Sequence, residues 1–561
     1  MLPVGSWSSH EAGLAVLTGP GPASASLIRA WLDGGCHADA PVRQGFVAVL
    51  SRPDGSGVIA SGSRWEQSAL YAADGPRLLV GTHPRDLIEA LPAPPPLSVA
   101  KLVDLLALYD APDTTVHDGI RRVPLGHALL VGADGTQSLH RWFDPSVAED
   151  RGIRVADAPA LLREAVAEAV AASLPEADGP VAAAVSGGLD SSMVVASAAR
   201  HRAITGLTHV PLPGTPDPHP GWDASDASYV AALASHVGRL SVRELVNDQR
   251  VHPLDACDQA VRRTWHPVFN PGNQAWVNQL VHAAEELGSP VLLTGASGNA
   301  TYSRDRAGIV RELVVRRRAG ALAREVRARA AADGGWAGAL RSVGREAAPP
   351  ALLARTRRLR GITSGDAAPG ADELPYLVAR ISDAARAELA ELADDHVPDR
   401  AEWTRFALMD SSRIGSVQSL SPAVWWSDPL SDPGVIATAL RLPEEAWLAG
   451  GRSRGLARAA SAGLVPDVIR LRRTHGAQAA DTATVVAGTE HRYRELLERF
   501  RASATVPAFV DLDRLEASLG EEFRDPTTAL EWQGVYGRAF AVGQFAVWYE
   551  DEVLGRGAGG L

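Results

Sequence analysis

The sequence predicts an α/β protein in which a β-rich layer domain precedes a doubly wound parallel sheet with helical additions. The first 145 or so residues are short apolar segments, among them GFVAVLSR, ALYAAD and RLLVGT, separated by glycine, proline and aspartate turns. Beyond residue 158, strand-like and helical segments alternate, which is typical of a parallel sheet that binds ligands at the C-terminal ends of its strands. In the run VAAAVSGGLDSSMVVASAA, a strand breaks into glycines and restarts as a helix.

In this second part, strands and helices alternate, and each helix returns the chain so that the next strand can run parallel to the last. The apolar spacing of APALLREAVAEAVAASLP predicts a helix that leads into a buried strand, Val181–Val185, and then a helix over Ser191–Ala199. The further expected elements are a strand at 203–212, a loop at 213–226, a helix at 227–238 capped by Asp223 or Asp226, a helix at 277–288 and a strand at 290–295.

The turn SGG at 186–188 directs backbone N–H groups towards an anion. Its glycines allow a tight turn, and the first turn of the next helix offers unsatisfied donors and the positive end of its dipole. Ser191 and Ser192 add hydroxyl donors, and Asp190 adds a carboxylate that can hold Mg²⁺. A plain connection is the alternative, but the added serines and aspartate favour a phosphate site.

Composition excludes several classes of function. Hydrophobic residues make up 46% and charged residues 22%, as in ordinary globular proteins, and a formal net charge of −11 argues against non-specific nucleic-acid binding. No apolar run approaches the roughly 18 residues of a membrane span, and MLPVGSWSSHEAG lacks the features of a signal peptide, so we expect a cytoplasmic protein. Cys36 and Cys257 are the only cysteines, which indicates neither a disulfide framework nor a zinc site.

Lysine is almost absent from the sequence. Lys101 is the only lysine among the 55 basic residues, and the others are all arginine. A GC-rich genome would explain the bias. Its chemical consequence is that no catalytic lysine can exist after residue 101.

Arginine is concentrated in one region, residues 304 to 360, on a helix-forming background, and GITSGDAAPGADE after it predicts a flexible break. A solvated helical face is the favoured interpretation. A docking surface for an acidic peptide or partner domain is the alternative.

Several motifs together resemble the asparagine synthetase family of PP-loop ATP pyrophosphatases. SGGLDSS ends a buried strand, PLPGTPD follows the next strand, and VLLTG resembles the family's second nucleotide-contacting turn. TTVHDGIRRVPLGHALLV followed by RWFDP resembles the segment that ends the family's glutaminase-like domain. The resemblance implies a degenerate glutaminase-like layer domain of the Ntn type at 1–148 and a PP-loop synthetase domain at 149–561, with residues 304–372 as an arginine-rich helical insertion.

The resemblance also implies ATP and Mg²⁺. A carboxylate attacks the α-phosphate of ATP, pyrophosphate departs, and an amine takes the acyl-adenylate to give an amide. Asp190 would coordinate Mg²⁺, Arg473 would stabilise the developing charge, and His475 is a candidate acid, base or substrate ligand. Pyrophosphate would be held by Ser186, Gly187, Gly188, Asp190, Ser191 and Ser192, and adenosine by Val185, Val210, Thr294 and Gly295.

Four departures from the family pattern reduce the number of activities within the family that the sequence allows. Leu2 stands where glutamine-dependent members have a cysteine nucleophile, so we expect no ammonia from glutamine. Ala296 stands where the synthetases have glutamate and β-lactam synthetase has tyrosine, and Asn299 replaces a magnesium-binding aspartate. The family's lysine falls at Arg473, which cannot give up its proton. WWSDPLSD replaces an acidic pattern, which indicates an acceptor other than free aspartate.

A peptide α-amine suits such a site, because its unperturbed pKa of about 7.7–8.0 leaves part of it neutral at physiological pH. Lasso peptide cyclases use this amine, and the segments THVPLPGTPD, NPGNQAW, LLTGASGNATYS, RRTHGAQAAD and RAFAVGQFAVWYE resemble that branch. The resemblance implies a linear core peptide closed into an isopeptide macrolactam through an Asp or Glu side chain. It also implies a leader peptidase and a leader-binding protein as partners.

Two other functions stay open. One is a glutamine-independent amide synthetase that acts on a small carboxylate, and the other is a non-catalytic nucleotide-binding regulator. Individual side chains also have structural alternatives. A surface or packed histidine is an equally good interpretation of His475. Gln478 and Asp481 could hold a peptide or stabilise a loop. The Trp pair at 425–426, like Tyr302, could line a pocket or belong to the core.

Overall fold

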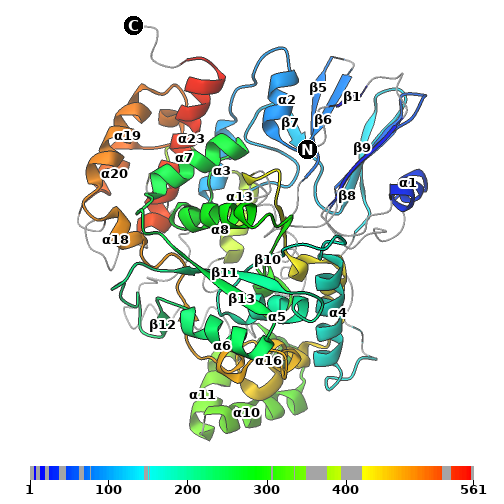
Figure 1. Ribbon diagram of the computed structural model, residues 1–561, viewed down its shortest axis with the longest axis vertical. Helices are drawn as coiled ribbons and strands as arrows, with labels where there is room; N and C mark the ends of the chain where they lie inside the picture. Colours follow the sequence, from blue (N-terminus) through cyan, green and yellow to red (C-terminus); the bar gives the residue numbers. More distant parts are fainter. Residues whose placement is uncertain are drawn as a thin grey trace.

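The N-terminal part of the computed structural model contains two antiparallel sheets that pack face to face (Figure 1). One sheet has the strand order β2-β3-β4-β8-β9 and the other has the order β1-β6-β5-β7. These strands are β1 (Gly5–Trp7), β2 (Gly13–Thr18), β3 (Phe46–Ser51), β4 (Gly57–Ser61), β5 (Leu70–Asp74), β6 (Arg77–Gly81), β7 (Ile120–Arg122), β8 (His127–Val131) and β9 (Gln137–Arg141). The structure describes residues 5–7, 13–18, 25–36, 46–61, 68–75, 77–143, 150, 152–304, 308–333, 335–348, 374, 376–392, 420–520, 523 and 532–556.

Helices cover the outer faces of both sheets. Val47 and Ile59 of one sheet pack against Tyr71 and Val80 of the other, so the space between the sheets is apolar. Helix α1 (Ala25–Asp33) covers one outer face, while α2 (Pro84–Ala90) and α3 (Val99–Leu106) pack on the other sheet. The β-rich layer expected from the turn pattern is confirmed. The kinship of this layer with Ntn hydrolases stays a prediction, and Leu2 lies outside the described residues.

The two parts of the chain share an extensive contact. The core that contains α3 continues into helices near the C-terminus. Buried histidines bridge the parts, since the Nε2 atoms of His83 and His117 lie 2.8 and 3.0 Å from the carbonyl oxygens of Arg263 and Trp265. The predicted boundary at 148/149 falls outside the described residues, so the division into two domains stays a prediction.

The single lysine is buried in the N-terminal part. Lys101, on α3, has its Nζ 3.9 Å from an Asp110 oxygen, and Arg122 Nη2 lies 2.5 Å from the same oxygen. Burial lowers the pKa of Lys101, and the Asp110 carboxylate opposes this shift.

The second part is built on a five-stranded parallel sheet with the order β13-β11-β10-β14-β15, as the alternating pattern predicts. Its central strand β10 is covered on both faces, because Ala183 packs into one apolar core and Ala182 into another. The strands are β10 (Ala182–Ala184), β11 (Ile204–Val210), β13 (Leu240–Val246), β14 (Val291–Leu293) and β15 (Trp425–Ser427), and the helices between them are α5 (Leu189–Ala198), α6 (Ala227–Val237), α7 (Pro253–Thr264) and α8 (Gln274–Glu286), with α4 (Ala158–Ala172) preceding the sheet.

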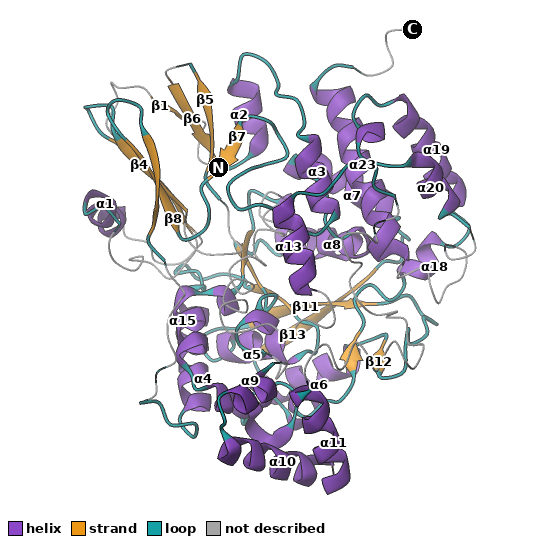
Figure 2. Ribbon diagram, turned by 180° about the vertical axis from the view of Figure 1, so that it is seen from behind, coloured by secondary structure: helices purple, strands orange, loops and turns teal. Residues whose placement is uncertain are grey.

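The chain order reverses between β10 and β14, because the strands that follow β10 are added on one side before β14 returns to the other. Open α/β sheets bind ligands at such a switch point. Further helices complete the architecture around the sheet (Figure 2). They are α9 (Ile309–Val315), α10 (Ala319–Asp333), α11 (Trp336–Ala347), α13 (Asp383–Leu392), α15 (Pro433–Arg441), α16 (Gly455–Ala460), α17 (Asp467–Arg470), α18 (Thr482–Val486), α19 (Glu490–Ala502), α20 (Leu512–Ala517) and α23 (Arg538–Trp548).

Two elements deviate from expectation. Asp226 does occupy the N-cap position of α6, but its side chain makes no capping hydrogen bond and pairs with Arg472 instead. The predicted loop at 213–226 contains a two-residue strand, β12 (Trp222–Asp223), which pairs in parallel with β16 (His475–Gly476). Both differences arise from contacts with a distant segment of the chain, which local sequence does not reveal.

Most of the described arginines between residues 304 and 348 are exposed, as the favoured interpretation of a solvated helical face predicts, but two of them are buried. Arg329 on α10 is buried and pairs with Glu325 at 2.5 Å and with Glu346 at 2.6 Å. Arg304 forms a second buried pair with Glu444. The insertion predicted at 304–372 continues beyond the described residues, so its extent stays a prediction.

Among the residues that the structure describes, no helix is both long and apolar enough to cross a bilayer.

Candidate functional site

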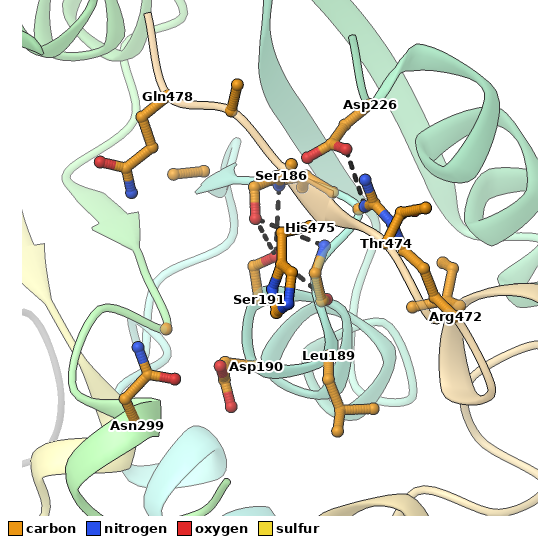
Figure 3. Close-up of a pocket in the computed structure, with 18 of the residues that line it drawn as sticks. Ser186, Leu189, Asp190, Ser191, Asp226, Asn299, Arg472, Thr474, His475 and Gln478 are labelled. Carbon is orange, nitrogen blue, oxygen red and sulfur yellow. Dashed lines mark hydrogen bonds and ion pairs between the residues drawn. The ribbon is translucent and has the colours of Figure 1, made fainter. Parts of the chain in front are cut away.

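A cavity of about 770 Å³ opens at the C-terminal ends of the parallel strands (Figure 3). Its walls come from the β10–α5 turn, the end of β11, the turn after β14, the loop before α16 and the segment 469–479. The cavity therefore lies at the switch point of the sheet, where the strand order predicts a ligand.

The turn after β10 forms a compact donor group in the cavity wall. Ser186 N donates to Ser191 Oγ over 3.2 Å, and the hydroxyls of these two serines lie 3.1 Å apart. Gly188 N donates to Ser186 Oγ over a longer distance of 3.4 Å. This hydrogen bond is weak, so the Gly188 N–H group can also donate to a ligand. With the N-terminus of α5 beside them, these groups have the donors that a phosphate chain would need.

Three glycines allow the surrounding segments to approach this turn. Gly187 has φ +63°, and a Cβ there would lie 2.8 Å from Tyr229 Cβ. A Cβ on Gly295 would lie 2.7 Å from Ser191 N, and one on Gly298 would collide with the Asp190 carboxyl group. The turn after β14 is therefore pressed against the start of α5, which sets the position of Asp190.

Asp190 has the character of a cation ligand. Its Oδ1 is buried without a hydrogen-bond partner among the described residues, and its Oδ2 lies 3.8 Å from Arg454 Nη1. Burial raises the pKa of Asp190, while Arg454 and Ser303 oppose the shift. A buried carboxylate oxygen without a partner fits a hard cation such as Mg²⁺, which one or two carboxylates and phosphate oxygens usually hold. Asn299 also lines this part of the cavity, so the residues present fit the metal.

The cavity is rich in arginine. Five arginines line it, against Asp190 and Asp226 as its only acidic lining residues in the described chain. Arg458 donates to the carbonyl oxygens of Ser453 and Arg472 and so fixes the wall. The positive excess suits a polyphosphate. The arginines are Arg452, Arg454, Arg458, Arg472 and Arg473.

Arg472 ties the wall to the phosphate turn. Its Nη1 lies 2.7 Å from Asp226 Oδ1 (Figure 3). Its Nη2 lies 2.7 Å from Asp223 Oδ2, and its guanidinium stacks 3.9 Å from the centre of the Tyr229 ring. Burial raises the pKa of Asp226, and Arg472 opposes that shift. Since a Cβ on Gly476 would collide with the Asp226 carboxylate, segment 472–476 and α6 are interlocked.

The cavity lining also contains three tryptophans. They are Trp222, Trp276 and Trp426, and the Trp222 ring lies 5.1 Å from the His475 ring. Trp426 is buried, so it belongs to the core and to the cavity wall at once. Such walls suit a ligand with apolar groups.

Gln478 is exposed and lines the cavity, whereas Tyr302 belongs to the core. Gln478 Oε1 accepts a 2.7 Å hydrogen bond from Asn273, which joins two segments beside the cavity. Tyr302 is a core residue whose hydroxyl donates to Ala457 O.

The structure brings most of the predicted site residues to one place, and their roles stay predictions. Ser192 is fully buried within α5, and neither it nor Val210 is among the residues that line the cavity, where Thr208 and His209 represent β11 instead. Those that line it are Val185, Ser186, Gly187, Gly188, Asp190, Ser191, Thr294, Gly295, Arg473 and His475.

The sequence did not reveal Arg454, His209 or Trp276 as site residues. Arg454 stands in a region without a recognised motif, and it adopts the αL conformation (φ +57°) just before α16. His209 and Trp276 belong to two segments that resemble the lasso cyclase branch, THVPLPGTPD and NPGNQAW. Nothing in these segments marks the two side chains as cavity residues.

Comparison with known protein families identifies a match over most of the chain. The model of the family described as asparagine synthase matches residues 161–550, which is more than half of the chain. The matched range includes the whole cavity lining. No curated protein matches the chain.

Proposed function

This chain belongs to the asparagine synthase family of ATP-dependent ligase-type enzymes, which use ATP, generally with Mg²⁺, and on that basis we propose that it is an AMP-forming amide synthetase acting on a peptide. The observation that carries the proposal is the arrangement of the phosphate turn, Asp190 and Arg454 in one arginine-rich cavity. This arrangement suits the binding of a triphosphate with its α-phosphate open to attack.

Three groups of cavity residues have separate roles in the proposed reaction. The N–H groups of the turn at 186–188 and the hydroxyl of Ser191 would hold the leaving pyrophosphate, and Asp190 would hold a Mg²⁺ ion, which would supply neutralising charge. Arg454 and Arg473 stabilise the charge that develops on the phosphates as the carboxylate attacks. The two less exposed tryptophans of the lining, Trp276 and Trp426, would limit the access of water and so protect the acyl-adenylate from hydrolysis until the amine arrives.

We infer that the amine is the N-terminal α-amine of the same peptide, as in lasso peptide cyclases. Among the described lining residues there is no lysine, tyrosine, glutamate or cysteine, so the cavity suits an amine that is already partly neutral. The motifs that resemble lasso cyclases support this assignment, and they extend it to a leader peptidase and a leader-binding protein as proposed partners. The product would be an isopeptide macrolactam.

The test follows pyrophosphate release and peptide mass with ATP and Mg²⁺. A leader-free precursor peptide should release pyrophosphate and lose one water, and the same peptide acetylated at its N-terminus should not lose water. Turnover with a small acid and ammonia, but with no peptide, would point to the small-carboxylate synthetase. Nucleotide binding without any turnover would point to a regulator.

Asp190→Asn is the matched variant for this test. It removes the charge and keeps the shape, so pyrophosphate release should fall by about 10²–10³-fold. The thermal unfolding midpoint should stay close to that of the wild type, because Oδ1 of this carboxylate has no hydrogen-bond partner among the described residues. Normal turnover of this variant would contradict the assignment of Asp190.

A further inference from the structure

The cavity offers few groups that can accept a proton. Apart from arginines, its titratable lining residues within the described chain are Asp190, His209, Asp226 and His475. Arginine does not release its proton and so cannot serve as a base. The proton that an attacking amine loses must therefore go to one of these four side chains or to water.

Two of the four are engaged in ion pairs with arginine, and the third, His475, has no carboxylate beside it among the described residues to orient its ring. Asp190 lies beside Arg454 and has the surroundings of a cation ligand. Asp226 is paired with Arg472 at 2.7 Å behind the phosphate turn. His475 is exposed and lies against the ring of Trp222, which is itself 41% exposed.

His209 has the surroundings of a base. It lies near the C-terminal end of β11, beside the central strand that leads into the phosphate turn, and its side chain is only 14% exposed. Its Nε2 lies 3.9 Å from Asp481 Oδ1, which is too long for a hydrogen bond but is an ion-pair distance once the ring is protonated. Trp276 flanks the ring, with 6.5 Å between ring centres.

Asp481 is itself held in place. Its side chain is 4% exposed, and its Oδ2 accepts a hydrogen bond from Leu212 N over 3.2 Å. A reacting group, a base and an orienting carboxylate in series form a recurring catalytic arrangement. With Asp481 on the Nε2 side of His209, Nδ1 is the nitrogen left to meet a substrate.

We propose that His209 is the general base that takes the proton from the attacking amine, with Asp481 as its positioning residue. The proposal rests on the proposed function. The amine lone pair forms the C–N bond with the acyl carbon, the bond from that carbon to the AMP oxygen breaks, and AMP leaves with the electron pair. The proton lost by the amine nitrogen goes to Nδ1 of His209, and Asp481 stabilises the imidazolium.

The protonation state of His209 agrees with this role. Burial lowers the pKa of His209, and the Asp481 carboxylate opposes this shift. Asp481 is the only charged group recorded against the ring in the described part of the chain, and Trp276 on α8 is neutral. A lowered pKa keeps the imidazole neutral, and thus able to accept a proton, at pH 7.

The experiment separates the two half-reactions in the full-length protein. Hydroxylamine, which is nucleophilic without help from a base, traps the activated carboxylate as a hydroxamate, and mass spectrometry follows macrolactam from the leader-free peptide. His209→Gln should form hydroxamate within about threefold of the wild type but form macrolactam at least about 10²-fold more slowly. His236→Gln, at an exposed position of α6, is the matched control and should match the wild type in both.

Several results would overturn the assignment. An equal loss of hydroxamate and macrolactam in His209→Gln would place His209 in nucleotide binding or folding, and rates equal to the wild type would exclude it as the base. No hydroxamate from the wild type with any peptide would refute the proposed function itself, and this assignment with it.

Asp481→Asn provides a second route if His209→Gln does not fold. Removing the charge should move the acidic limb of the macrolactam pH–rate profile to lower pH, because the carboxylate that raises the pKa of His209 is gone. The hydroxamate profile should stay in place. An unmoved macrolactam limb would contradict the proposal.

Discussion

Two adjacent serines of the phosphate turn have opposite surroundings. Ser191 Oγ accepts a hydrogen bond from Ser186 N and lines the cavity, whereas the Ser192 side chain is fully buried in α5 and its hydroxyl has no partner among the described residues. The sequence motif contains both and does not distinguish them. Their positions one residue apart on a helix, about 100° around its axis, decide which one reaches the ligand.

Substitution of each serine tests this difference. Ser191→Ala should lower pyrophosphate release by about tenfold, which corresponds to the loss of one hydrogen bond to a charged group. Ser192→Ala should keep release within about twofold, because it removes only a buried hydroxyl without a partner among the described residues. Steady-state kinetics with ATP measure both. A greater loss in Ser192→Ala would mean that its hydroxyl reaches the phosphates in the bound state.

The phosphate turn and Asp190 could be located from sequence because the glycines, serines and carboxylate of SGGLDSS are neighbours in the chain. Arg454, His209 and Asp481 could not be grouped in this way. They come from three segments whose proximity depends on the sheet order and on the pairing of β12 with β16. No local pattern encodes a contact between residues as distant in sequence as His209 and Asp481.

At the scale of elements, the turn after β14 and the start of α5 are in direct contact. A Cβ on Gly298 would collide with the Asp190 carboxyl group, so only glycine allows the observed approach. The loop that carries Arg452 and Arg454 is supported in the same way, because Gly451 (φ +66°) lies against the backbone of α10. The arginine-rich helices therefore support one wall of the cavity.

Alanine at Gly298 tests the contact between these elements. Gly298→Ala should displace Asp190 and lower pyrophosphate release by at least about tenfold, since a misplacement of about 1 Å can cost a hundredfold. Gly338→Ala is the control. It lies in α11 with open space around it, so it should retain activity and raise the unfolding free energy by about 0.5–1 kcal/mol. Equal activity of the two variants would contradict the role of the contact.

The strands and helices next to the motif agree with the sequence prediction, apart from their ends. Helix α5 begins at Leu189, ahead of the expected start at Ser191. Strand β13 and helix α7 were not predicted. The strand reads LSVRELV and lies at the edge of the sheet, where its middle residues are exposed, so the apolar pattern that marks a buried strand is missing.

At the scale of the whole molecule, buried histidines join the N-terminal part to the end of α7 and to a helix near the C-terminus. His117 is 1% exposed, its Nε2 contacts Trp265 O, and its ring lies 5.1 Å from the Tyr549 ring. Burial lowers the pKa of His117 to about 4, and the contact with Trp265 opposes the shift. The contact between the two parts therefore depends on a neutral histidine.

Acidification should weaken this contact. A histidine with a folded pKa of about 4 and an unfolded pKa of about 6.5 binds its proton more tightly in the unfolded chain, so stability is complete above pH 6.5 and falls as the pH drops towards 4. For His117 alone, the loss at pH 5 is about 2 kcal/mol of unfolding free energy. Denaturant unfolding of the wild type and of His117→Gln at pH 7 and pH 5 measures it.

The variant should lose less stability than the wild type between these two pH values. Some pH dependence should remain, because burial also lowers the pKa of His252 to about 4. An identical loss in both proteins would show that His117 is not the group responsible.

The isolation of Lys101 has a consequence for the chemistry of the cavity. An acyl-adenylate is an acylating agent, and lysine side chains are the usual targets when such an agent escapes from a protein. The only lysine of this chain is enclosed beside Asp110 and Arg122 on α3, in the N-terminal part and outside the cavity lining. In the proposed reaction, an activated peptide that leaves the cavity early would therefore meet no accessible lysine on its own enzyme, and acylation of the enzyme at a side-chain amine would be avoided.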